Sequence, residues 1–132
     1  MPLESDILRV RLAQVETRAG APGDNTQCML RQISRAREEG VALLVFPELA
    51  ITGFLLGDEW ECPAFLRECE ECGQEIVAAT AGITVVFGNV AIECGKRNED
   101  GRRRKYNALF FAEDRRLLAP VGSPRPFAVK AL

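Results

Sequence analysis

The sequence predicts an α/β domain with a mixed sheet, and three observations support this prediction. Two amphipathic helical segments alternate with strongly apolar strands, which is the arrangement of parallel βαβ units. The last third of the chain then contains several short strands separated by turn residues, which adds an antiparallel part to the sheet. A length of 132 residues with 47% hydrophobic residues suffices for one domain with a buried core, or for part of a larger one.

The first two predicted elements are a strand and a helix. Residues 7–14 alternate apolar and polar side chains, which predicts a half-buried strand. The apolar face of this strand consists of Leu8, Val10 and Leu12. Asp24, followed three positions later by Gln27, resembles a capping box and predicts the start of the helix. Gly40 suits the position directly after the helix. The inner stripe of the helix is predicted to contain Met29, Ile33 and Ala36.

A second strand and a second helix follow. Residues 41–46 have no polar alternation, which predicts a strand buried on both faces. After an irregular segment, Pro63 is predicted to occupy the first position of the second helix, and we expect Gly82 to close that helix. Its inner stripe is predicted to contain Phe65, Cys69, Cys72 and Ile76.

The remaining elements are predicted strands, which are residues 83–90, 106–112, 117–119 and 127–132. Asp100 and Gly101 form a strong turn pair in the polar segment between the first two of these strands, which therefore predict a hairpin. Residues 120–126 contain proline and glycine and are expected to form a loop. The element order is thus β-α-β-α-β-β-β-β.

The composition excludes several classes of function. The chain contains no histidine, which removes Ser-His-Asp triads, Cys-His dyads and His-ligated metal sites within it. The net charge of −2 gives no reason to expect nucleic acid or an anionic membrane as a partner. No signal peptide and no apolar run of about 20 residues is evident, so we expect a cytoplasmic protein without a membrane segment.

The cysteines are expected to be reduced thiols. They are Cys28, Cys62, Cys69, Cys72 and Cys94. An odd number of cysteines without a secretion signal is typical of a reducing compartment. Because the sequence offers a single CxxC pair, we predict no zinc site and no other metal.

Glu48 is the first candidate functional residue. Pro47 interrupts the apolar strand, and Glu48 follows at the carboxyl end of this strand, where ligand sites of α/β sheets usually lie. A carboxylate beside so apolar a segment is expected to reach solvent or to have a partner. Apolar surroundings would raise its pKa towards the range of a general base. From position alone, the alternative of a loop residue that caps the next turn is favoured over a catalytic acid.

Several segments together follow a known pattern. They are Ala13-Gln14, Gly23-Asp24-Asn25, Leu44 to Phe54 with its Pro-Glu and Gly-aromatic pairs, Gly82 to Asn89 and Tyr106 to Phe111. These segments resemble the nitrilase (carbon–nitrogen hydrolase) superfamily. Within it, the chain is most similar to the glutaminase domain of glutamine-dependent NAD+ synthetases. The resemblance implies that residues 1–132 are the N-terminal part of one nitrilase-type domain, an αββα sandwich that is truncated at its C-terminus.

The resemblance also implies roles for individual residues. Members of the superfamily use a Glu-Lys-Cys triad, in which Glu48 would be the general base and Lys130 the lysine. Phe54 would contact substrate at a position where tyrosine is common in the synthetase group. Two alternatives remain open for the lysine: Lys130 could be an edge-strand lysine that blocks aggregation, or another alignment could place the lysine site at Ser123.

The nucleophile is expected outside this sequence. In the superfamily the catalytic cysteine lies well beyond the lysine, and none of the five cysteines matches that context. The resemblance therefore implies that residues 1–132 alone are inactive.

The resemblance finally implies partners. They are glutamine or another small amide as substrate, with no cofactor for the amide step, and a following synthetase domain that would use ATP and deamido-NAD+. We also expect a homo-oligomer, because a sheet cut at its last strand exposes edges and apolar faces. The alternatives are an inactive assembly module and another amidase of the nitrilase superfamily.

Overall fold

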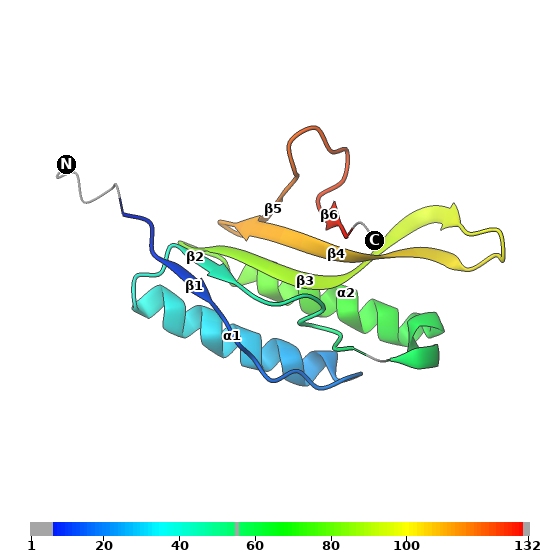
Figure 1. Ribbon diagram of the computed structural model, residues 1–132, viewed down its shortest axis with the longest axis horizontal. Coiled ribbons are helices and arrows are strands. Elements are labelled where there is room, and N and C mark those ends of the chain that lie inside the picture. Colours follow the sequence, from blue (N-terminus) through cyan, green and yellow to red (C-terminus); the bar gives the residue numbers. More distant parts are fainter. Residues whose placement is uncertain (1–6, 55, 131–132) are drawn as a thin grey trace.

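The computed structural model describes residues 7–54 and 56–130, except for the side chain of Cys94. These residues form a sheet of six strands with two helices packed on one face (Figure 1). The elements are β1 (Val10–Leu12), α1 (Pro22–Glu38), β2 (Leu43–Val45), the short 3₁₀ helix η2 (Gly57–Glu61), α2 (Pro63–Ala78), β3 (Thr84–Arg97), β4 (Arg103–Glu113), β5 (Arg116–Leu118) and β6 (Ala128–Val129). The predicted order of strands and helices is confirmed.

The sheet is mixed, as the sequence predicted. β1, β2 and β3 are parallel neighbours, because each connection between them contains a helix that returns the chain to the same end of the sheet. β3 and β4 form a long antiparallel hairpin. β5 and β6 both pair with β4 at its outer edge, β5 near the end of β4 and β6 near its middle. Parallel βαβ units and a late hairpin thus share one sheet.

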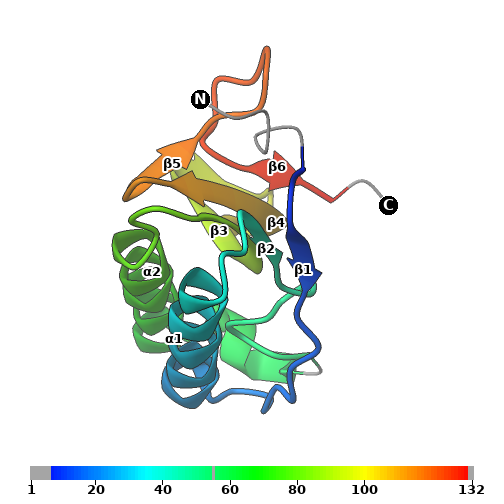
Figure 2. The ribbon, with the colours of Figure 1, turned by 90° about the vertical axis from the view of Figure 1, so that its left-hand side faces the viewer.

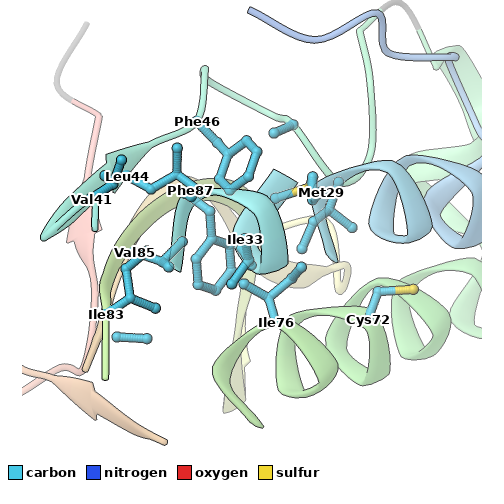
Figure 3. Close-up of a cluster of buried hydrophobic side chains, with 14 residues drawn as sticks. Met29, Ile33, Val41, Leu44, Phe46, Cys72, Ile76, Ile83, Val85 and Phe87 are labelled. Atoms are coloured by element: carbon cyan, nitrogen blue, oxygen red, sulfur yellow. The ribbon is translucent and has the colours of Figure 1, made fainter. Parts of the chain in front are cut away.

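The core lies between the sheet and the two helices (Figures 2 and 3). The predicted inner stripe of α1 is buried at all three positions, and that of α2 at all four. From the sheet, alternate residues of the central strands contribute to the same cluster, among them Leu44, Val85 and Phe87. The rings of Phe87 and Phe110 stack with centroids 5.3 Å apart. Helical periodicity and strand alternation therefore agree on one buried layer.

Two predicted helix ends are wrong. α1 begins at Pro22 rather than at Asp24, and no side chain caps it, because proline already has the backbone angle of the first helical position. Its other end is as predicted: Gly40 follows the C-cap residue with φ +74°. α2 ends at Ala78 and its C-cap is Ala79, so Gly82 lies in the turn before β3 instead of closing the helix.

The predicted burial of the first two strands is also partly wrong. Leu8, Val10 and Leu12 do share one face of the strand, but they are between 50% and 73% exposed. Within β2 only Leu44 is fully buried, whereas its two neighbours are half-buried. Both differences have one cause: the helices cover a single face of the sheet, so side chains on the other face lack that cover.

The C-terminal part of the chain follows the prediction in outline. The loop at residues 119–127 connects β5 to β6 at the β4 edge of the sheet and projects away from α1 and α2 (Figure 1). Of the strand predicted at residues 127–132, the structure forms Ala128–Val129 as β6, and residues 131–132 lie outside the described part. Neither α1 nor α2 is long and apolar enough to cross a membrane.

Candidate active site

Glu48 lies in a sharp turn at the carboxyl end of β2. Directly after β2, the Phe46 amide donates a hydrogen bond to the Val86 carbonyl of β3 at 2.8 Å. Two residues after Pro47 the backbone enters the left-handed region at Leu49, where φ is +48°. This conformation is uncommon for a residue other than glycine, and such residues cluster at functional sites. The turn leaves the Glu48 side chain 40% exposed on the helix-free side of the sheet.

Gly88 of β3 makes room for this turn. A Cβ atom at this position would lie 2.4 Å from the Leu49 amide nitrogen and 2.7 Å from the Pro47 carbonyl oxygen. The segment around Glu48 therefore packs directly on the backbone of β3, which separates β2 from β4. In this position the Glu48 carboxylate reaches over β3 to a group on β4 and to one directly after β6.

Lys130 contacts Glu48 from the segment that follows β6. Its amide donates to the Asn107 carbonyl at 2.9 Å, directly after the last paired residue of β6. Its ammonium Nζ lies 2.6 Å from Glu48 Oε1, and its side chain is 49% exposed. The two residues are 82 positions apart in the sequence. The structure thus brings together the two residues that the resemblance proposed as catalytic.

Asn107 is a further member of this site that was not predicted as one. Its side-chain amide donates a hydrogen bond to Glu48 Oε1, the same oxygen that binds Lys130. A polar residue inside the apolar segment of residues 106–112 was the signal that could have identified it.

The charge environment of Glu48 differs from the expectation. The pKa of Glu48 is lowered, not raised, because the hydrogen bonds from Lys130 and then Asn107 stabilise the carboxylate more than its limited burial disfavours it. The prediction of a raised pKa is therefore wrong. It considered only the apolar strand before Glu48 and not the ammonium and amide that face it. Glu48 is ionised at neutral pH and can accept a proton.

A cavity of about 290 Å³ adjoins these groups. It is lined by Glu48, Asn107, Ala108, Leu109, Ala128, Val129 and Lys130. Phe54 does not line this cavity and is 47% exposed, so its contact with substrate stays a prediction. Ser123, the alternative position for the lysine, exchanges hydrogen bonds with Arg125 within its own loop. The geometry favours Lys130 as the cation of this site.

The described cysteines lie outside the cavity. Cys69 and Cys72 are buried on α2, as the apolar stripe predicted. Burial, followed by the neighbouring Cys72 and then by nearby acidic side chains, raises the pKa of Cys69 to about 12. Such a thiol is a poor nucleophile. Within residues 7–54 and 56–130, no group of three or more His, Cys, Asp and Glu side chains is arranged to hold a metal ion.

Comparison with known families agrees with this geometry. The pattern of the carbon–nitrogen hydrolase family matches residues 9–124, and the chain belongs to this family. The glutamine-dependent NAD(+) synthetase of Xylella fastidiosa is 33% identical over 143 residues, which cover 97% of this chain and 26% of the relative. That of Xanthomonas campestris pv. campestris is 42% identical over 82 residues, 61% of this chain. The chain thus spans about a quarter or less of the length of these curated relatives.

Solved structures support the same family and fold. A glutamine-dependent NAD(+) synthetase from Cytophaga hutchinsonii superposes with a TM-score of 0.71 and 26% identity, over 82% of this chain and 17% of that one. An amidase from Nesterenkonia sp. superposes with a TM-score of 0.62 and 20% identity, over 82% of this chain and 39% of that one, which shows the shared fold alone. The family match ends before Lys130, so the position of this lysine in the site depends on the structure itself.

Proposed function

We propose that this chain provides the general base and the oxyanion-stabilising cation of a glutamine amide hydrolase. The observation that carries the proposal is the contact between Lys130 Nζ and Glu48 Oε1 at 2.6 Å, beside a cavity of about 290 Å³. This volume lies near the lower end of the range of small-molecule pockets, which suits a small amide. The similarity to glutamine-dependent NAD(+) synthetases supports glutamine as that amide.

The proposed reaction proceeds through a thioester. Glu48 accepts the proton of a cysteine thiol, and the sulfur forms a bond to the side-chain carboxamide carbon of glutamine. The carbonyl electron pair moves to the oxygen, whose negative charge is stabilised by the Lys130 ammonium. The C–N bond then breaks, and the proton held by Glu48 leaves with ammonia. Water adds to the thioester, which releases glutamate and restores the thiol.

The nucleophile is proposed to come from sequence beyond residue 132. Two observations support this: none of the four cysteines with described side chains lines the cavity, and burial on α2 raises the pKa of both Cys69 and Cys72. A thiol with a raised pKa carries little of the reactive thiolate at neutral pH. Residues 1–132 alone are thus proposed to be inactive.

Two partners are also proposed. A following synthetase domain would consume the ammonia with ATP and deamido-NAD+, and a homo-oligomer would cover the exposed sheet face.

Ammonia release from glutamine tests this proposal. We expect no turnover by the 132-residue chain, and turnover once the chain is extended by the sequence that follows it in its gene. In the extended protein, Glu48→Gln should lower kcat on the order of 10²- to 10⁴-fold, the usual contribution of a positioned general base. Turnover of the 132-residue chain that survives Glu48→Ala would refute both the role of Glu48 and the proposed position of the nucleophile.

Lys105→Met is a matched control. Lys105 forms a second lysine–glutamate ion pair with Glu61 at 3.1 Å, and neither residue lines the cavity. This variant should keep the kcat of the parent protein. Acetamide and asparagine as competing substrates separate a glutaminase from an amidase of other specificity: comparable kcat/KM on all three amides would contradict glutamine as the preferred substrate.

A further inference from the structure

Asn107 makes two contacts that no other described residue makes together. Its side-chain amide donates to Glu48 Oε1, and its main-chain carbonyl accepts the amide of Lys130 at 2.9 Å. One residue of β4 thereby holds the side chain of the proposed base and the backbone of the proposed cation. From these contacts we infer that Asn107 is the positioning residue of the Glu48–Lys130 pair, an inference that rests on the proposed function.

Strand register places Asn107 in this position. Ala108 pairs with Val129 and Leu109 pairs with Ala128, so Asn107 lies opposite Lys130 in the same antiparallel ladder. Side chains that lie opposite each other in such a ladder project from the same face. Leu109 is in turn paired with Gly88, and Asn107 follows on the same face two residues away. The missing side chain of Gly88 is therefore what allows the Glu48 turn to approach both residues.

The contacts distinguish the two oxygens of Glu48. Oε1 accepts hydrogen bonds from both Asn107 and Lys130, whereas Oε2 accepts none from the described residues. With Oε1 occupied by two donors, Oε2 is the oxygen that remains to take a proton. Asn107 thus fixes the rotation of the Glu48 carboxylate, so that Oε2 keeps a constant orientation towards the nucleophile. Lys130 alone would not do this, since an ammonium on a flexible stem does not hold a carboxylate in one plane.

The electrostatics agree with this arrangement. The hydrogen bond from Asn107 follows that from Lys130 among the causes that lower the pKa of Glu48. Lys130 is the charged group that faces Glu48 within the described part of the chain. Loss of the amide donor should accordingly raise the pKa of Glu48 even when Lys130 is intact.

An NMR titration tests the inference without any need for turnover. In the 132-residue protein labelled at the glutamate side-chain carboxyl carbons, Asn107→Ala should shift the titration of Glu48 to higher pH. Asn107→Gln, which keeps an amide donor on a longer stem, should restore part of the difference. Asn98→Ala on the same hairpin removes an amide that accepts from Arg104, and it should leave the titration of Glu48 unchanged. An unchanged Glu48 titration in folded Asn107→Ala would overturn the inference.

A kinetic arm in the extended protein separates this inference from the proposed function. Asn107→Ala should lower kcat on the order of 10²-fold with little change in KM, because misplacement of a catalytic group by about 1 Å has an effect of this size. The acidic limb of its pH–rate profile should move to higher pH. If Glu48→Gln abolishes turnover while Asn107→Ala leaves both kcat and the profile unchanged, the inference about Asn107 alone fails. If Glu48→Gln retains turnover, the proposed function itself fails. If Asn107→Ala does not fold, Asn107→Ser supplies the same two readouts.

Discussion

Gly88 shows at the scale of a single residue how the site depends on a close backbone approach. We predict that Gly88→Ala displaces the Glu48 turn, since the new Cβ would lie 2.4 Å and 2.7 Å from backbone atoms of Leu49 and Pro47. Overpacking of this kind typically costs about 1–3 kcal/mol of unfolding free energy. Urea denaturation measures this loss, and the NMR titration of Glu48 reports the displaced turn. Gly23→Ala is the control: its Cβ would make an ordinary contact, 3.7 Å from Glu68 Oε1. Equal stability of the Gly88→Ala and Gly23→Ala variants would contradict a close approach of the Glu48 turn to the backbone of Gly88.

Among the secondary-structure elements, a charged cluster anchors the loop before β6 to strands β3 and β4. Glu93 of β3 accepts a hydrogen bond from the Tyr106 hydroxyl at 2.6 Å and lies 3.3 Å from the Arg125 guanidinium. Arg125 also lies over the Tyr106 ring, 4.9 Å from its centroid. The segment that leads to Lys130 is thereby attached to both strands of the hairpin.

This cluster predicts an acid-dependent loosening of β6. The hydrogen bond from Tyr106, followed by that from Lys96, lowers the pKa of Glu93 from 4.5 to about 2. A carboxyl whose pKa is lowered in the folded state stabilises the fold above its ordinary pKa, and this contribution is lost as the pH falls from 4.5 towards 2. The amide NMR shifts of Ala128 and Val129 should report the loosening over this interval.

Glu93→Gln is the variant that isolates this effect. It should loosen β6 at neutral pH, where the parent protein has the Glu93 carboxylate, and remove the part of the pH dependence that belongs to Glu93. Glu48, whose pKa is lowered as well and which contacts Lys130 directly after β6, contributes to the pH dependence that remains. Glu99→Gln in the hairpin tip serves as the control and should behave as the parent protein. Identical β6 shifts in Glu93→Gln and the parent across the acid range would contradict an anchoring role of Glu93.

The elements also show which features a sequence can predict. The inner stripes of α1 and α2 were predicted correctly because a helical period fixes which side chains share a face, whatever they pack against. The burial of Leu8, Val10 and Leu12 was not, since exposure of a strand face depends on which side the helices cover. Asn107 was missed for a related reason. Its function depends on the register of β4 with β6 and on a glycine in β3, and local periodicity contains no information on either.

For the whole molecule, the central feature is a layer of helices on one side of a mixed sheet (Figure 2). The candidate site lies on the other side, where the Glu48 turn packs on Gly88. The helix side contains the main core cluster, and the opposite side carries Gly88, Asn107 and the Glu48–Lys130 contact. The site is assembled from β4 and from the segments directly after β2 and β6, and its residues are separated by as many as 82 positions. Function therefore depends on the sheet as a whole, and the periodicity of any one strand does not reveal it.

A double-variant cycle on glutamine hydrolysis tests whether Glu48 and Lys130 act together as the base and the cation of an amide hydrolase. In the extended protein, kcat is measured for the parent, Glu48→Gln, Lys130→Met and the two changes together. If base and cation act as one unit, each single variant loses on the order of 10²-fold or more, and the combined variant loses far less than the product of the two. Parent-like kcat in either single variant, or fully multiplicative losses in the double variant, would contradict an amide hydrolase built on Glu48 and Lys130.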